Sequence, residues 1–514
     1  MTSDTQSAPN EPSDASLSDG SSIPLANTEK FTSGRKFKVF ALSAGKGLTR
    51  VIGMLAMMVM ARELTKTDLA AYRQTFLAYS MVIPILGLGV GQAMYYFLPA
   101  EKERMRGRVM DGIAALGAMG LLFALFVALG GNELLAAKFS NPQVARLLLW
   151  LIPYAIVSIP ASATESVLVA RDKALMASVF GVFRQLLVGI STIIPLIFWS
   201  TAEAPLIGNV VASILMGIVG ISLMFRAVSG GGSPWPKLAG IRELLFFAVP
   251  LALGGMISTI SKQLDQVIVT VLRTPAEFAE YSLGAMELPL VGIITGALTS
   301  VMLADMRKSI VEGDKEKALR LFHTVGEKSS LVMLPVMVFL LLTADTIIQY
   351  LYTAAYADSA YPFRVYLTLL PIRTVVFGSL LLALGLNKFV LYRCIAGLIF
   401  NLVLSAILVW QIGPIGAAVA TVATMYFCEV PACIIMLAHK LDKSWLDIMP
   451  YRAMARIFLD LIPVTILSLI IMWQFKNIHL EFFLISLSFA IFALYYWNEK
   501  LYSLKDIQRW VARP

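Results

Sequence analysis

Five basic residues lie inside long apolar stretches of the sequence, where a charge is costly. They are Lys46, Arg50, Arg184, Lys262 and Arg373. An ionisable side chain in a membrane-spanning helix costs about 2.5–3.5 kcal/mol, so the five together cost on the order of 12–17 kcal/mol. Residues of this kind face a water-filled cavity or a partner inside the protein. The pattern therefore predicts a cationic cavity suited to an anion.

The strongest of these candidates is the pair Lys46 and Arg50 in the segment GKGLTR. Because they are four residues apart, they share one face of a helix. At 1.5 Å per residue they lie roughly 12–18 Å from the expected cytoplasmic end of that helix. Two like charges on one face repel each other, and a bound anion would relieve the repulsion. The alternative is that the side chains snorkel toward the headgroups, which suits Lys46 better than Arg50.

The other three cations have acidic residues within the same set of apolar stretches. Arg184 and Arg373 either line the cavity or pair with an acid, and the available acids are Glu165, Glu287 and Glu429. Lys262 and Asp265 are three apart on one expected helix, so we expect them to neutralise each other. An alternative for Asp265 and Glu287 is that they bind a coupling ion.

Cysteines, histidines and glycines give no sign of catalysis. The three cysteines lie in apolar runs and the three histidines are scattered among connecting segments, so neither a disulfide framework nor a metal site is expected. GKG at 45–47 lacks the spacing of a phosphate-binding loop, and GLGVG at 87–91 lies in an apolar helix rather than after a strand. We expect no enzyme activity, no cofactor and no nucleic-acid partner.

Composition indicates what kind of scaffold positions these residues. Of 514 residues, 58% are hydrophobic and 15% charged, with a mean hydropathy of +0.75, a balance that a soluble core cannot accommodate. Apolar runs of about 20 residues, long enough to cross a bilayer, recur about fourteen times. We expect an all-α, polytopic membrane protein with helices at 38–61, 70–98, 109–131, 144–170, 174–199, 204–226, 243–272, 279–305, 318–343, 361–386, 389–411, 414–438, 453–474 and 479–497.

Charge asymmetry predicts the orientation. Lys and Arg concentrate in alternate connecting segments, such as those after the helices at 70–98 and 279–305, which places both termini in the cytoplasm. The predicted organisation is a disordered tail at 1–34, an N-terminal lobe at 35–228, a linker at 229–242, a C-terminal lobe at 243–438, two further helices at 453–497 and a cytoplasmic tail at 498–514.

Two short turns on the expected outer side match each other. LTKTDLAAY at 64–72 and LRTPAEFAEY at 272–281 each place an acidic residue near a helix start and a tyrosine after it. Six helices separate them, which predicts two parallel six-helix lobes related by an axis along the membrane normal, with the last two helices appended. The alternative is that short outer turns simply look alike.

Several segments resemble bacterial oligosaccharide flippases, the O-antigen and polysaccharide branch of the multidrug/oligosaccharidyl-lipid/polysaccharide exporter superfamily. The resemblance covers about residues 38–440, and no single motif in it is highly specific. Its segments are GLTRVIGMLAMMVMARELTKTDLAAYRQTF, LGLGVGQA, FAVPLALGGMISTISKQLDQVIVTVLRTPAEFAEYSLG and GPIGAAVATVATMYFCEV.

This resemblance implies an alternating-access carrier in the bacterial inner membrane, with a cationic central cavity. The implied substrate is an undecaprenyl-pyrophosphate-linked oligosaccharide, moved from the cytoplasmic to the periplasmic leaflet during polysaccharide or lipopolysaccharide biosynthesis. The implied partners are the lipid bilayer, the lipid-linked oligosaccharide and a polysaccharide polymerase machinery.

Other functions predict different residues. A multidrug or cation antiporter of the same superfamily needs acids where the first helix carries Lys46 and Arg50, whereas a peptidoglycan-precursor (lipid II) flippase also takes an anionic substrate. A membrane-bound polymerase or ligase needs a long outer loop with catalytic side chains. The longest expected outer segment, 344–360, carries only Asp345 and Asp358 as charged residues, which disfavours the enzyme.

Overall fold

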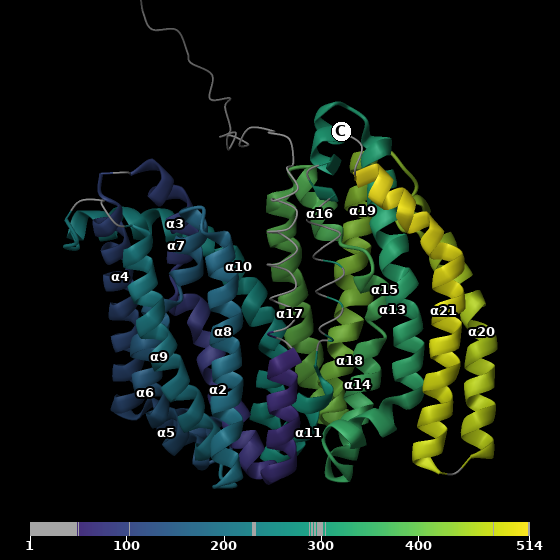
Figure 1. The fold of residues 1–514 in the computed structure, drawn as a ribbon, viewed down its shortest axis with the longest axis horizontal. Helices are drawn as coiled ribbons and strands as arrows, with labels where there is room; N and C mark the ends of the chain where they lie inside the picture. The colour runs from purple at the N-terminus through teal and green to yellow at the C-terminus, as the bar shows by residue number, and fades with distance from the viewer. Residues whose placement is uncertain are drawn as a thin grey trace, which may run out of the picture.

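The protein is built from helices. The computed structural model describes residues 49, 51–101, 103–228, 233–286, 288, 291, 295, 302, 303, 305–475 and 477–511, and no strand occurs among them. Figure 1 shows a group of helices at the left, here called the N-terminal group, and a group at the right, the C-terminal group, with α10 (Leu238–Leu272) between them.

The N-terminal group holds the helical residues 51–63 and the elements α2 (Lys66–Leu86), α3 (Val90–Ala100), α4 (Met105–Phe126), η1 (Val127–Gly131), α5 (Asn132–Lys138), α6 (Gln143–Ala161), α7 (Thr164–Ala170), α8 (Ala174–Ile193), η2 (Ile194–Ile197) and α9 (Glu203–Ala227). The C-terminal group holds α11 (Pro275–Gly284), α13 (Lys315–Leu351), η3 (Ala354–Ser359), α14 (Ala360–Leu367), α15 (Leu370–Arg373), α16 (Phe377–Ala383), α17 (Asn387–Ile412), α18 (Ile415–Thr424), η4 (Met425–Glu429), α19 (Val430–Leu441) and η5 (Trp445–Asp447). At the right edge of Figure 1, α20 (Tyr451–Gln474) and α21 (Ile478–Val511) pack on α13.

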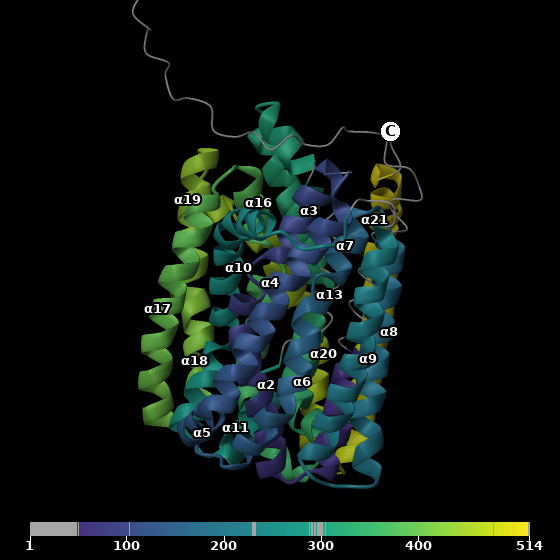
Figure 2. The same ribbon diagram turned by 90° about the vertical axis from the view of Figure 1, so that its left-hand side faces the viewer.

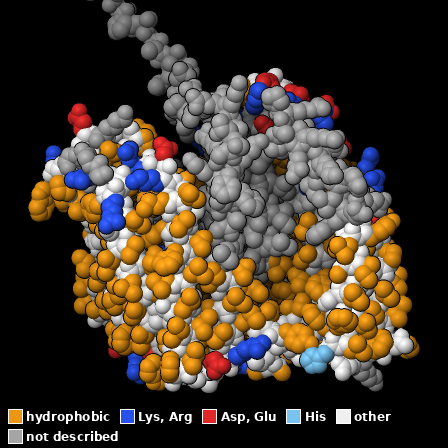
Figure 3. Space-filling view, in the orientation of Figure 1, with side chains coloured by type: hydrophobic (Ala, Val, Ile, Leu, Met, Phe, Trp, Pro, Cys, Tyr) orange, Lys and Arg blue, Asp and Glu red, His pale blue; other side chains and the backbone are white. Residues whose placement is uncertain are grey.

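The bundle has the surface of a membrane protein. Its described residues hold 10 helices long and apolar enough to cross a membrane, or up to 11 if the bent pair Ala354–Leu367 and Leu370–Ala383 is one span. Apolar side chains cover the middle of the face in Figure 3, and charged side chains gather toward its two ends. Trp199, Trp410 and Trp473 are exposed at or just beyond helix ends, where interfacial tryptophans belong. The prediction of an all-α, multi-pass membrane protein is confirmed.

The count of fourteen spans stays a prediction, as do the limits of the lobes. The tail at 1–34 lies outside the described residues, and so do 12 of the 24 residues of the predicted span 38–61 and 13 of the 27 residues of the predicted span 279–305. The predicted span 243–272 falls within α10, a single helix of 35 residues. The last helix, α21, continues beyond its predicted end at 497 to Val511.

Two predicted spans are broken helices. The span predicted at 70–98 is interrupted between α2 and α3, where Leu88 and Gly89 have φ of 49° and 70°. A Cβ on Gly89 would lie 2.4 Å from the carbonyl oxygen of Ala248, so glycine is needed for this close approach to α10. The span predicted at 361–386 bends by 47° between α14 and α15.

The two matched turns adopt the same local structure. Thr65 caps α2 by accepting a hydrogen bond from the backbone of Asp68, and Thr274 caps α11 in a capping box with Glu277. The two helices pack against each other, and Lys66 on α2 forms a 2.5 Å ion pair with Glu280 on α11. The matched turns therefore meet at one end of the protein and join the two groups there.

Helix α10 contacts both groups, and the turned view of Figure 2 shows it running along α3 and α4. Near its start, the Arg108 guanidinium lies 2.7 Å from the Glu243 carboxylate and donates to the carbonyl of Gly240 at 3.0 Å. Near its end, Arg273 donates to the carbonyl of Val409 on α17. The start of α10 is thus held by the N-terminal group, and its end is held by the C-terminal group through α17 and also contacts α2, where Ser80 donates to Gln263 at 2.8 Å.

Candidate functional site

A central cavity of about 520 Å³ lies between the two groups, a size typical of small-molecule sites. From the N-terminal group it is lined by Gly53, Met54, Met57 and Arg73. The C-terminal side supplies hydroxyl and amide side chains, namely Ser261, Gln263, Gln266, Ser282, Asn401, Thr421 and Thr424. Helices from both groups and α10 therefore surround one chamber that has polar side chains in its wall.

Three cations line this cavity, Arg73, Lys262 and Arg373. Lys262 projects from α10 with an exposed side chain, and among the described residues it forms no ion pair. The Arg73 guanidinium donates to the Met57 sulfur at 3.4 Å, and its buried Nε has no hydrogen-bond partner in the described part of the chain. A thioether is a weak acceptor, so Arg73 keeps hydrogen-bonding capacity for an anion.

The two acids that line the cavity are each held by neighbouring side chains. Asp265 is 4% exposed, and its Oδ2 accepts hydrogen bonds from the hydroxyls of Tyr281, at 2.7 Å, and Tyr366. Glu429 on η4 accepts from Arg393 on α17 at 2.7 Å. Because Arg393 balances Glu429, three lining cations face one remaining carboxylate, so the field inside the cavity is positive.

The expected neutralisation of Lys262 by Asp265 is wrong. Although the two are three apart on α10, Asp265 is buried against α11 and α14 through the two tyrosines, whereas Lys262 is exposed toward the cavity. Burial of the carboxylate removes it from the reach of the flexible lysine. The buried Oδ1 of Asp265 has no hydrogen-bond partner in the residues described, so its role in ion coupling stays a prediction.

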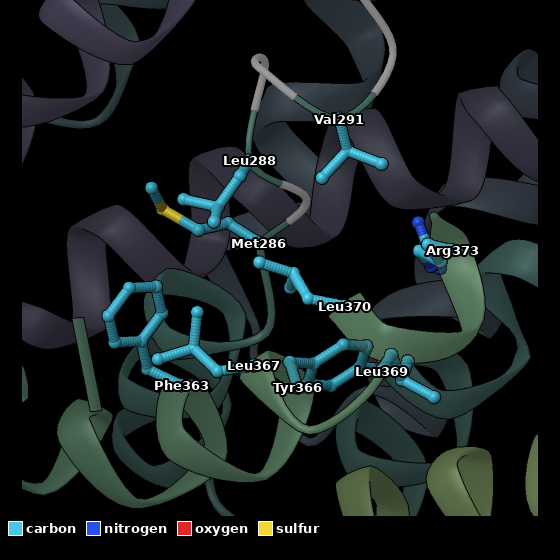
Figure 4. A pocket seen from close by; sticks show the side chains of 9 residues that line it. All are labelled: Met286, Leu288, Val291, Phe363, Tyr366, Leu367, Leu369, Leu370 and Arg373. Atoms are coloured by element: carbon cyan, nitrogen blue, oxygen red, sulfur yellow. The ribbon is translucent and has the colours of Figure 1, made fainter. Parts of the chain in front are cut away.

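A smaller apolar pocket of about 20 Å³ adjoins the central cavity at the break between α14 and α15. Figure 4 shows Arg373 at one side of it and Phe363 at the other, with Leu367, Leu369 and Leu370 between them. Arg373 and Tyr366 line both spaces. The helix break therefore sets an arginine at the junction of a polar chamber and an apolar recess.

The remaining predicted site residues lie elsewhere or outside the description. Arg184 on α8 pairs with Glu165 on α7 at 3.5 Å and is not among the cavity-lining residues, which is the structural pairing left open by the sequence. Lys46, Arg50 and Glu287 lie outside the described residues, so their place in the site stays a prediction.

Sequence reasoning missed Arg73 and Arg393. Arg73 lies seven residues into α2, about 10 Å from its start, close enough to the helix end to pass for an interfacial residue. Its position directly after the tyrosine of the matched turn was the available signal, since Ser282 follows Tyr281 in the second turn and also lines the cavity. Arg393 lies near the start of α17, where a basic residue is equally common.

Structural comparison shows that solved membrane transporters share this fold. A lipid II flippase, MurJ, in an inward closed conformation matches with a TM-score of 0.70 and 16% identity, over 91% of this chain and 99% of that one. A multidrug resistance MATE family transporter of the MOP superfamily, inward-facing, matches with a TM-score of 0.60 and 15% identity, over 79% and 98%. A MOP superfamily transporter from Pyrococcus furiosus matches with a TM-score of 0.55 and 16% identity, over 81% and 100%.

Sequence comparison defines the family. A family model described as "Polysaccharide biosynthesis protein" matches residues 59–361, which is more than half of the chain. No curated protein matches the sequence significantly. The chain belongs to this polysaccharide biosynthesis protein family, and it has the MurJ- and MATE-like fold.

Proposed function

We propose that this protein moves an undecaprenyl-pyrophosphate-linked oligosaccharide from the cytoplasmic to the periplasmic leaflet of a bacterial inner membrane. The observation that carries the proposal is the central cavity, where Arg73, Lys262 and Arg373 face a chamber whose two acids are held by other side chains. Arginine and lysine are the side chains that bind phosphate groups, so the ligand of this chamber is an anion of the pyrophosphate kind.

The uncharged lining suits a glycan. Hydroxyl and amide groups from α10, α17 and α18 offer donors and acceptors on the C-terminal side, and four methionines give adaptable apolar walls. The four are Met54, Met57, Met286 and Met425. Family membership and these features together support the export of a sugar-bearing lipid, in polysaccharide or lipopolysaccharide synthesis, next to the polymerase machinery.

Energetics support outward movement without a catalytic centre. Moving a negative charge outward across an inside-negative membrane is favourable by about 2.3 kcal/mol per charge per 100 mV. Cytoplasmic termini, alternating access and the absence of enzyme activity belong to the same proposal. The competing substrate is a peptidoglycan precursor, because the lipid II flippase shares the fold.

The test is a flipping assay in proteoliposomes. The wild type is expected to move a fluorescent undecaprenyl-pyrophosphate-linked oligosaccharide faster than lipid II, and Lys262→Ala and Arg373→Ala are each expected to slow it by about tenfold or more, the loss of one charge-assisted contact. Arg146→Ala is the matched control, because Arg146 is an exposed cation paired with Glu203 and does not line the cavity. Extrusion of cationic dyes with no movement of the lipid would replace the proposal with an antiporter.

A further inference from the structure

The pair Arg393–Glu429 is built into the wall of the central cavity. The Glu429 carboxylate lines the cavity, and Arg393 does not, so the guanidinium lies behind the acid as seen from the chamber. Their side chains are only 17% and 12% exposed, and the two charged groups lie 2.7 Å apart. An acidic side chain is unexpected in the wall of a cavity that binds an anion. The position of Glu429 in front of Arg393 therefore calls for a physical explanation.

Local structure holds the carboxylate in this position. Glu429 ends η4, a π-helical turn, and such turns insert one extra residue and are frequent at functional sites. Gly397 on α17 faces it, and a Cβ there would lie 2.7 Å from Glu429 Oε1. The π turn and the glycine together let the acid lie between α17 and the chamber.

The guanidinium behind it is under-satisfied. Arg393 Nε is buried without a partner among the described residues, and the further contacts of Arg393 are with the sulfurs of two cysteines, Cys394 at 3.8 Å and Cys433, which are weak acceptors. Glu429 is therefore its one strong acceptor in this part of the chain. Arg373, on the same cavity wall, also interacts electrostatically with Glu429. Glu429 thus pairs directly with one guanidinium group and feels the charge of a second one.

We propose that Glu429 is a built-in counter-anion, which the pyrophosphate of the substrate displaces from Arg393 and which then takes up a proton from the cavity water. This inference rests on the proposed function. Arg393 becomes a further substrate-binding cation, since a phosphate can take both guanidinium branches where one carboxylate took one. The carboxylate next to a bound pyrophosphate has lost its cation and gained a like charge, and both changes favour its neutral form.

The groups around Glu429 agree with that direction. The elements that pack on η4 are α17, α18 and α19, and α18 carries no titratable side chain. α17 presents Arg393 and Cys394, α19 presents Cys433, and Arg373 lies on α15. The charged groups among these neighbours are Arg393 and Arg373. The binding of the anion is therefore the change that leads Glu429 to take up a proton.

Isothermal titration calorimetry of the full chain in nanodiscs tests the inference, with farnesyl pyrophosphate as the probe. Titrations in two buffers of different ionisation enthalpy near neutral pH measure the protons taken up on binding. The wild type is expected to take up close to one proton more than Glu429→Gln, which keeps an acceptor for Arg393 but cannot titrate. Glu429→Gln is also expected to bind about tenfold more tightly, because a charged competitor for Arg393 is gone.

A double-mutant cycle separates direct contact from a general change in charge. Arg393→Met is expected to weaken binding more in the Glu429→Gln background than in the wild type, because only a displaced or neutralised Glu429 leaves Arg393 open to the ligand. Asp345→Asn is the control, since Asp345 pairs with Arg364 outside the cavity.

Two outcomes would overturn the inference. If the wild type takes up no more protons than the titration of the ligand itself requires, Glu429 stays paired with Arg393. This measurement uses the wild type alone, so it does not depend on whether a variant folds. Additive effects of Arg393→Met and Glu429→Gln would make the pair structural only. Binding without these linkages leaves the proposed function standing, whereas a wild type that binds no isoprenyl pyrophosphate rejects both.

Discussion

Residues 64–73 and 272–282 both turn the chain at a threonine cap and then present a tyrosine followed by a cavity-lining residue. Beyond that point the two turns differ. In the first, Tyr72 accepts a hydrogen bond of 3.4 Å from the amide of Asn209, and the next residue is Arg73. In the second, Tyr281 donates to Asp265 at 2.7 Å, and the next residue is Ser282.

The difference shows how the two matched turns, with the same local backbone structure, take different chemical roles. Backbone geometry is shared, because the cap sets where each helix starts and hence which side chains face the chamber. The first turn places a cation there, and the second holds an acid and leaves a hydroxyl. An anion carrier needs this division, because equivalent acids on both sides would cancel the cationic field.

The largest expected contrast is between Arg73→Ala and Ser282→Ala. Removing the guanidinium is expected to slow flipping of the lipid-linked oligosaccharide by about 10- to 100-fold, whereas loss of a neutral hydroxyl contact costs about threefold. Rates in proteoliposomes, compared at equal protein reconstitution, measure both. Equal effects at the two positions would show that the turns contribute alike and that charge is not the reason for their difference.

A smaller contrast concerns stability. Tyr281→Phe removes a hydrogen bond to a buried carboxylate and is expected to cost about 1.5–3 kcal/mol, while Tyr72→Phe removes a long neutral one and costs about 0.5–1.5 kcal/mol. Thermal unfolding in detergent, followed by tryptophan fluorescence, reports the order. Should Tyr72→Phe prove the more damaging, Asp265 would be held by Tyr366 alone.

The smallest contrast lies in the caps. Thr274→Ala breaks a reciprocal capping box and is expected to cost about 1–2 kcal/mol, and Thr65→Ala breaks a single cap for about 0.5–1 kcal/mol. The same unfolding assay applies, with Thr→Ser at each position as the control that keeps the hydroxyl. Transport is expected to persist in all four variants, since neither threonine lines the cavity.

Membrane helices and intramembrane cations were accessible from the sequence because lipid imposes strong rules on both. Lys262 and Arg373 line the cavity as their cost in an apolar segment predicts. The pairing of Arg184 with Glu165 was one of two open alternatives, because the two lie on different helices and their contact depends on packing.

What the sequence could not supply is the tertiary arrangement. Asp265 Oδ2 accepts hydrogen bonds from hydroxyls 16 and 101 residues away, so a pattern within one helix points to the wrong partner. The helix breaks at Gly89 and between α14 and α15 depend on neighbours and on the cavity, and hydropathy alone shows continuous spans there. Arg73 was not predicted because the depth of a residue in the bilayer, which the sequence indicates, does not determine its distance from the central cavity.

Helix α10 has a consequence for how the two groups stay together. By chain order α10 opens the second half, yet Arg108 of the first half pairs with Glu243 near its start, and Gly89 of the first half lies against Ala248. Two separately expressed halves, cut before residue 238, are therefore expected to reassemble in the membrane, because the first helix of the second half packs against the first half.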